Sequence, residues 1–174
     1  MKSETIVAIV LSIIVIAVSA LVILALEPSN KTVPYFHDKT VEEVENYILS
    51  MKNGENSSEL LFKDLKEVDE DILKYVMGIE PEYLDGYSVM TSETDATTFF
   101  VLRLKTGSKS LVETSVLEYM DYLEKQWEDT DKSQAELVQN YAKISYDNYL
   151  IYAVSDNNEY LKSQIDSLFV YADE

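Results

Sequence analysis

The sequence contains no cysteine, only four glycines and a single histidine in 174 residues. The lack of cysteine excludes disulfides, thiol catalysis and zinc sites with cysteine ligands. Because His37 is the only histidine, two histidines of one chain cannot share a metal, and we expect this side chain to be solvated or interfacial. The glycines form neither GxGxxG nor GxxxxGK[ST], so the sequence predicts no phosphate-cradling loop.

Basic residues are also scarce, with 14 Lys and Arg against 32 Asp and Glu and a formal net charge of −18. A surface this negative repels phosphate backbones, which argues against a nucleic-acid partner. The simplest interpretation is that acidity keeps an exposed domain soluble. Attraction of cations or of a basic partner surface remains an alternative.

One long apolar stretch, from Ile6 to Leu26, organises the chain. It carries no charge, and as a helix it is about 31 Å long, close to the hydrocarbon thickness of a bilayer. We therefore predict a single membrane span, with the membrane as a partner. A cleaved signal peptide is the alternative, but cleavable apolar regions are usually shorter. Lys2 on the short leader favours a cytoplasmic N-terminus and an extracytoplasmic C-terminal domain.

The chain divides by composition into an anchor (1–26), a juxtamembrane connector with a short helix (27–59) and a soluble acidic domain (60–174). Within the connector, Thr40 and Glu43 have the spacing of a capping box. The helix that follows has apolar residues on one stripe, namely Val41, Val44, Ile48 and Met51.

The domain contains a strand–strand–helix pattern that occurs twice. We predict an α+β fold: a two-layer sandwich in which a four-stranded, mostly antiparallel sheet carries its helices on one face. Asp69 is expected to cap a short helix over 70–77, and a helix near Ser133 to Tyr141 joins the two units. The predicted strands are Tyr87 to Thr91, Thr97 to Leu104, Lys143 to Tyr146 and Tyr149 to Val154; the helices follow capping boxes at Ser110–Glu113 and Asp156–Glu159.

From Leu65 to Phe169 the chain resembles domain-of-unknown-function family 4358, which occurs in envelope proteins of Gram-positive bacteria. The resemblance rests on Tyr75-Val-Met-Gly78-Ile, Tyr87, the strand Thr98 to Lys105, the long helix to Lys125-Gln126 and the hairpin Lys143 to Val154. Members are commonly lipid-anchored through cysteine, which this chain lacks, and tend to have glycine where Asp147-Asn148 stands. The family implies no activity and no site residue.

No catalytic, cofactor-binding or metal-binding residue stands out, and we expect no cofactor. His37, which a hydrolase triad would need, lies outside the predicted domain. Asp129-x-Asp131-x-Ser133 begins like a calcium-binding EF-hand loop. Position 6 is Gln134 instead of glycine and position 12 is Asn140 instead of glutamate, which favours a solvated acidic loop.

We therefore expect a single-pass, membrane-anchored protein that is not an enzyme. Its extracytoplasmic domain would act as an accessory or binding module for another envelope component. One alternative is an extracytoplasmic hydrolase or glycan-modifying enzyme that works through two carboxylates. Another is a weak binder of divalent cations.

Overall fold

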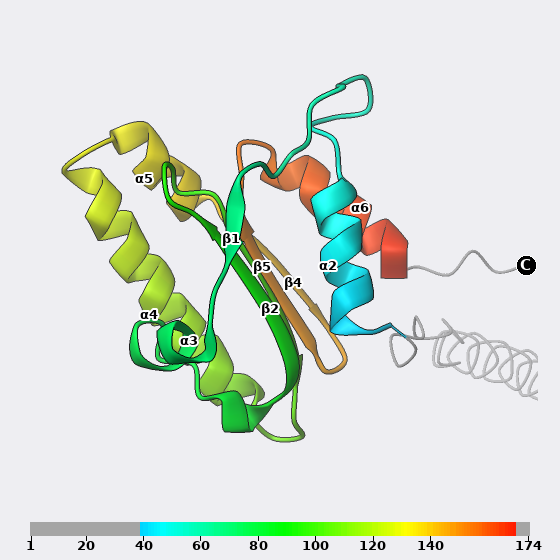
Figure 1. Ribbon diagram of the computed structural model, residues 1–174, viewed down its shortest axis with the longest axis vertical. Helices are drawn as coiled ribbons and strands as arrows, with labels where there is room; N and C mark the ends of the chain where they lie inside the picture. Colours follow the sequence, from blue (N-terminus) through cyan, green and yellow to red (C-terminus); the bar gives the residue numbers. More distant parts are fainter. Residues whose placement is uncertain (1–38, 170–174) are drawn as a thin grey trace, which may run out of the picture. The chain divides into compact units, whose positions relative to one another are not determined.

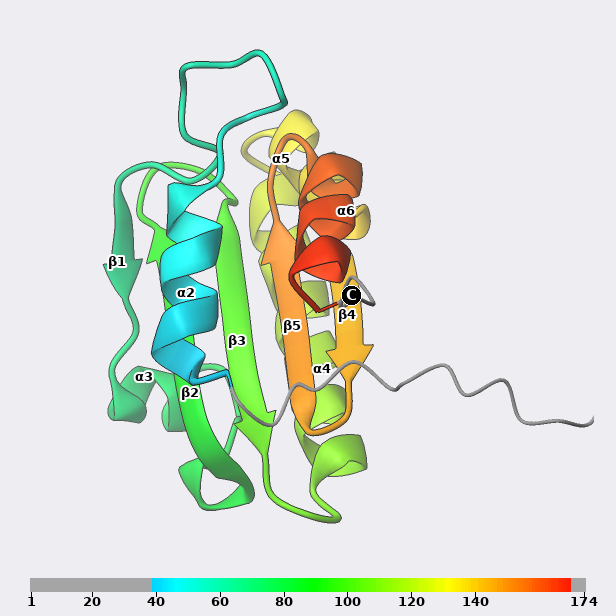
Figure 2. The same ribbon diagram turned by 90° about the vertical axis from the view of Figure 1, so that its right-hand side faces the viewer.

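The computed structural model describes residues 39–169. Five strands form a single sheet, which lies between two groups of helices in Figure 1. Every pair of neighbouring strands is antiparallel, and the spatial order is β1-β2-β3-β5-β4 (Figure 2). The strands are β1 (Leu65–Glu67), β2 (Leu84–Ser92), β3 (Thr98–Leu104), β4 (Ala142–Tyr146) and β5 (Tyr149–Val154).

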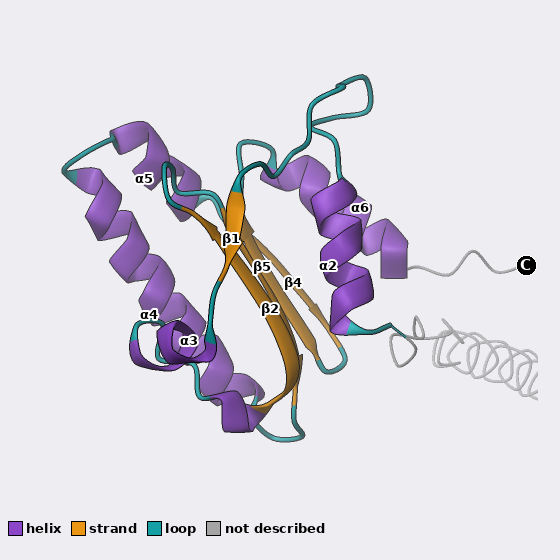
Figure 3. Ribbon diagram, viewed as in Figure 1, coloured by secondary structure: helices purple, strands orange, loops and turns teal. Residues whose placement is uncertain are grey.

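Helices cover both faces of this sheet, as Figures 1 and 3 show. One face carries α2 (Val41–Ser50) and α6 (Asn158–Phe169). The other carries α3 (Glu70–Tyr75), α4 (Lys109–Glu128) and α5 (Lys132–Gln139), with a short 3-10 turn, η2 (Pro81–Tyr83), before β2. The described part of the chain is therefore a three-layer α+β domain.

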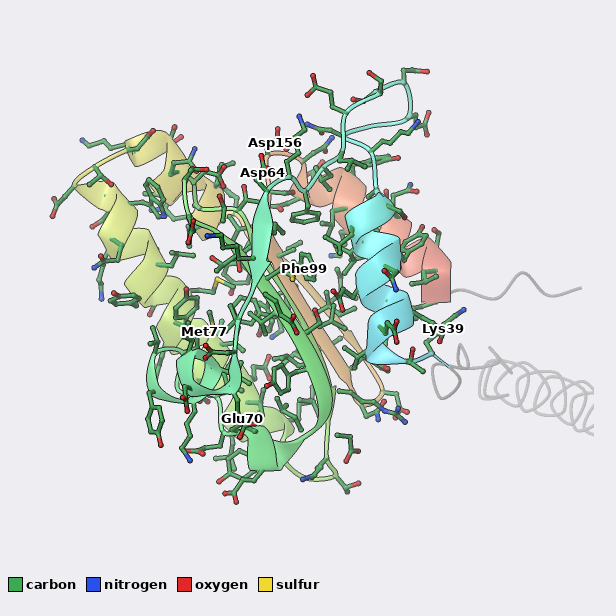
Figure 4. All side chains as sticks on the ribbon, in the orientation of Figure 1. Lys39, Asp64, Glu70, Met77, Phe99 and Asp156 are labelled. Carbon is green, nitrogen blue, oxygen red and sulfur yellow. The ribbon has the colours of Figure 1, made fainter. Side chains whose placement is uncertain are left out.

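The two central strands explain why both faces are covered. Phe99 and Val101 of β3 pack in the core beneath α2 and α6, whereas Phe100 and Leu102 pack in the core beneath α4. All four side chains are completely buried, and every residue of β5 is buried as well. Figure 4 places Phe99 on the α2 side of the sheet and Met77 on the α4 side. A sheet that is apolar on both faces requires two helical layers.

The structure confirms the α+β class and the antiparallel pairing, but two details of the predicted fold are wrong. The sheet has five strands instead of four, because β1 adds to the edge at β2 through Leu65 opposite Ser92. β1 has only three residues, too few for an alternating pattern to reveal it. The helices lie on both faces and not on one, for the reason given above.

Helix α2 is part of this packed structure. The predicted capping box is confirmed: Thr40 Oγ1 accepts a bond from Glu43 N (3.1 Å), and Glu43 Oε2 accepts one from Thr40 N (2.7 Å). Val44 and Ile48 are fully buried against the sheet. The Tyr149 hydroxyl donates to the carbonyl oxygen of Lys39 (2.6 Å), which ties the start of the helix to β5.

The N-terminal cap predicted for α3 is also confirmed, because Asp69 Oδ1 accepts a bond from Ile72 N at 2.8 Å. The helix ends by Val76, and Gly78 follows with a positive φ of 67°, a conformation that glycine adopts without strain. This turn leads the chain from α3 into η2 and β2.

The other two predicted capping boxes are wrong. Helix α4 begins at Lys109, and the Ser108 hydroxyl, which occupies the cap position, donates towards the carbonyl oxygens of Tyr83 and Lys105 instead of capping the helix. Glu113 pairs with Lys143 of β4. Helix α6 begins at Asn158, and the carboxylate of Asp156 accepts a bond from Asn53.

Between residues 39 and 169 no helix is both long and apolar enough to cross a membrane. The span predicted at Ile6 to Leu26 lies outside the residues that the structure describes.

Candidate functional site

A polar pocket of about 240 Å³ lies at one end of the sheet. It is formed by the loop after α2, the β2–β3 turn, α5 and the loop between β5 and α6. Three carboxylates line it: Glu59, Asp95 and Asp156. They come from separate parts of the chain, so this pocket is where a carboxylate-based activity would be sought first.

Each of these carboxylates has a structural partner. Asp95 Oδ1 accepts a bond from Thr97 N (2.9 Å) within the β2–β3 turn, and Asp156 Oδ2 accepts one from Asn53 Nδ2 (3.0 Å). Glu59 forms an ion pair with Lys63 at 2.8 Å, and the hydrogen bond from Lys63 lowers the pKa of Glu59. These bonds favour a role for the three carboxylates in fixing the loops.

A second pocket, of about 370 Å³, lies beside the start of α4. Lys105 and Lys109 line it together with Asp85 and Asp147, so its charge is mixed. Lys105 Nζ donates to the carbonyl oxygen of Glu82 at 2.7 Å, which holds the β3–α4 loop against η2. The arrangement does not select for one sign of ligand charge.

The EF-hand-like sequence forms a helix cap. Asp131 Oδ1 accepts bonds from Ser133 N (2.9 Å) and Ser133 Oγ (2.7 Å) at the start of α5. These bonds lower the pKa of Asp131. Nowhere in residues 39–169 do three or more His, Asp or Glu side chains gather in a way that could hold a metal ion, and His37 lies outside that range.

Exposed apolar side chains concentrate on two helices of one layer. Of the six large hydrophobic residues that are exposed among those described, five belong to α3, its C-cap or α4; the sixth is Leu60. We call these five residues the α3–α4 surface. They are Ile72 (41% exposed), Tyr75 (76%), Val76 (57%), Leu111 (54%) and Tyr122 (50%).

Contacts beneath this surface join its two helices. A Cβ built on Gly78 would lie 4.0 Å from Ser115 Oγ in the middle of α4, so the chain after α3 lies directly against that helix. Met77 is buried in the same core cluster as Val112 and Val116 of α4. Ser115 lies between Leu111 and Tyr122 on one stripe of α4, so the exposed apolar residues of α4 flank this contact.

The two exposed tyrosines rest on ordered neighbours. The ring of Tyr122 lies 6.1 Å from that of Tyr119, which in turn makes an edge-to-face contact with the buried ring of Phe100 at 5.8 Å. Lys74 Nζ lies 5.7 Å from the ring centroid of Tyr75 and forms an ion pair with Glu80 at 2.9 Å. The packing of Tyr122 on Tyr119 limits the motion of its ring, which reduces the conformational entropy that it loses when it binds a partner.

Sequence reasoning did not single out these five side chains. Within the helix predicted over 70–77, the structure buries Leu73 and Met77 and exposes Ile72 and Val76. Helix α3 is apolar on more than one face, but this pattern alone does not distinguish an exposed apolar face from a second buried one.

The described residues form a small α+β domain with a helix-covered sheet and exposed apolar side chains on α3, its C-cap and α4. The chain belongs to the family described as domain of unknown function DUF4358, whose model matches residues 57–155, more than half of the chain. This confirms the resemblance seen in the sequence. Helices α2 and α6, which cover one face of the sheet, lie outside the matched range. No curated protein and no solved structure matches the chain.

Proposed function

We propose that this protein is a non-enzymatic accessory module that binds another envelope protein through the α3–α4 surface. In this proposal Ile6 to Leu26 anchors the chain in the cell membrane, and the folded domain is extracytoplasmic. The observation that carries the proposal is that, within residues 39–169, five of the six exposed large hydrophobic residues belong to α3, its C-cap or α4.

Exposing several apolar side chains to water on neighbouring elements is unfavourable unless they bind a partner. Single exposed apolar residues are common on protein surfaces, but several gathered on neighbouring elements are typical of interaction sites. Two of the five are tyrosines, a residue type enriched in protein interfaces. The engaged carboxylates of the polar pocket supply no comparable argument for catalysis.

The test uses the full-length protein in its native membrane. Complexes are crosslinked and purified through the protein, and the co-purifying species are compared between the wild type and the double variant Tyr75→Ser/Tyr122→Ser. Leu60→Ser is the matched control, because Leu60 is also exposed but lies in the polar pocket.

We expect a reproducible protein partner that is retained by Leu60→Ser and lost from the double variant. Both tyrosines are exposed, so the double variant keeps its buried core, and circular dichroism verifies that it folds. If the same partner is recovered equally with all three proteins, the α3–α4 surface is not the binding site.

A further inference from the structure

We infer that the α3–α4 surface accepts a protein segment that presents apolar side chains between lysines or arginines. This inference rests on the proposed function and deepens it by naming the chemistry of the partner. It is carried by the charges that lie on the same two helices.

Acidic residues dominate these helices. From Asp69 to Val76 and from Lys109 to Glu128 there are eight acidic and three basic residues. Glu70, Asp71, Glu118 and Asp121 are exposed, and within residues 39–169 none of the four has an ion-pair partner. By contrast, the charge of Lys74 is already paired with Glu80. The exposed apolar residues therefore lie on helices with a negative potential.

Charge complementarity favours a basic partner over the two obvious alternatives. A second copy of the chain would bring the same acidic residues together, and each copy has a formal net charge of −18. Like charges facing each other across an interface suppress association. An anionic lipid surface would be repelled for the same reason.

The test measures binding of two fluorescent peptides to the full-length protein in nanodiscs of phosphatidylcholine, with empty nanodiscs as the blank. Both peptides are amphipathic helices with an identical leucine face, and the polar face carries lysine in one and glutamate in the other. Anisotropy gives the affinity at about 50 mM and about 500 mM NaCl, between which the Debye length falls from about 14 Å to about 4 Å.

We expect the lysine peptide to bind at least about tenfold more tightly than the glutamate peptide at low salt, and to lose most of that advantage at high salt. The variant Glu118→Gln/Asp121→Asn should reduce binding of the lysine peptide by about fivefold. Glu42→Gln/Glu45→Gln on α2 removes the same charge from the opposite helical layer and should change it less than twofold.

The outcomes separate this inference from the proposed function. If the two peptides bind equally and Tyr75→Ser/Tyr122→Ser weakens both, the surface binds apolar segments but the charge inference is wrong. If neither peptide binds, both the inference and the proposed docking surface fail. If the α2 variant weakens binding as much as the α4 variant, the attraction comes from overall charge and the inference is overturned.

Discussion

Helix α2 lies in the stretch that the sequence analysis assigns to a connector. Its packing against the sheet predicts that truncating one of its buried side chains lowers the unfolding free energy of the domain. Ile48 is completely buried, in a core cluster that includes Phe62, Phe99 and Val101. Truncation of a buried isoleucine to alanine costs about 2–5 kcal/mol, with the larger values where the surroundings cannot collapse. Because Ile48 is fully buried and shares its core cluster with two phenylalanines and the central strand β3, we expect about 3–4 kcal/mol for Ile48→Ala.

The assay is urea denaturation followed through the fluorescence of Trp127, the only tryptophan. Trp127 packs against the core beneath α4, on the opposite face of the sheet from Ile48. If the domain unfolds as one cooperative unit, a loss of unfolding free energy at Ile48 also destabilises the environment of Trp127. The Trp127 transition should therefore move to a lower urea concentration, with no change in the dependence of unfolding free energy on urea concentration.

Asn46→Ala is the matched control, because Asn46 is on the same helix but exposed. It should change the unfolding free energy by less than about 0.5 kcal/mol. The reasoning is refuted if Ile48→Ala leaves the Trp127 midpoint where it is in the wild type. A separate early transition for α2 would show that this helix is not part of the cooperative unit.

Three further predictions concern local features. Thr40→Ala removes the side-chain half of the capping box and should lower the unfolding free energy by about 1 kcal/mol in the same urea assay. Asp64 has a φ of 53°, so Asp64→Gly should raise the unfolding free energy by about 0.5–1 kcal/mol and Asp64→Val should lower it; equal effects of both would contradict the strain argument. Burial raises the pKa of Tyr152 to about 12, against the positive charge of Lys143. Since the folded pKa is above the unfolded value of about 10, the neutral phenol contributes stability below about pH 10 that is lost as the pH rises towards about 12, and Tyr152→Phe should flatten this decline in unfolding free energy.

Much of the secondary structure follows from local patterns. The strands at Thr98–Leu104 and Tyr149–Val154, the cap at Thr40 and the cap at Asp69 are where periodicity and capping rules place them. These features depend on residues only a few positions apart, and the short-range rules apply to them directly.

The arrangement of helices on both faces of the sheet could also have been predicted from the sequence. β3 alternates between two apolar faces, with Phe99 and Val101 on one and Phe100 and Leu102 on the other. A strand of that kind must be covered twice, and the stripe of α2 supplies part of the second cover. The two-layer prediction placed the helices of the domain on one face and so left the other apolar face of β3 uncovered.

The candidate surface could not be predicted in the same way. Whether Tyr75 or Tyr122 is exposed depends on how α3 and α4 meet at Gly78 and Ser115, a contact between residues far apart in the sequence. Tyrosine is common both in cores and at interfaces, and this chain has 13 of them. Periodicity alone cannot tell a tyrosine buried in the core from one exposed at an interface. A helix packed on two sides and a helix with one exposed apolar face have the same sequence pattern.

The central claim is that the α3–α4 surface contacts a protein partner in the membrane environment, and position-resolved photocrosslinking tests it most directly. A benzoylphenylalanine is placed either at Gln126, exposed one helical turn after Tyr122, or at Lys162, exposed on α6 in the opposite layer. After irradiation of native membranes, we predict a discrete adduct from position 126 and none from position 162. Equal adducts from both positions, or an adduct from position 162 alone, would contradict the account.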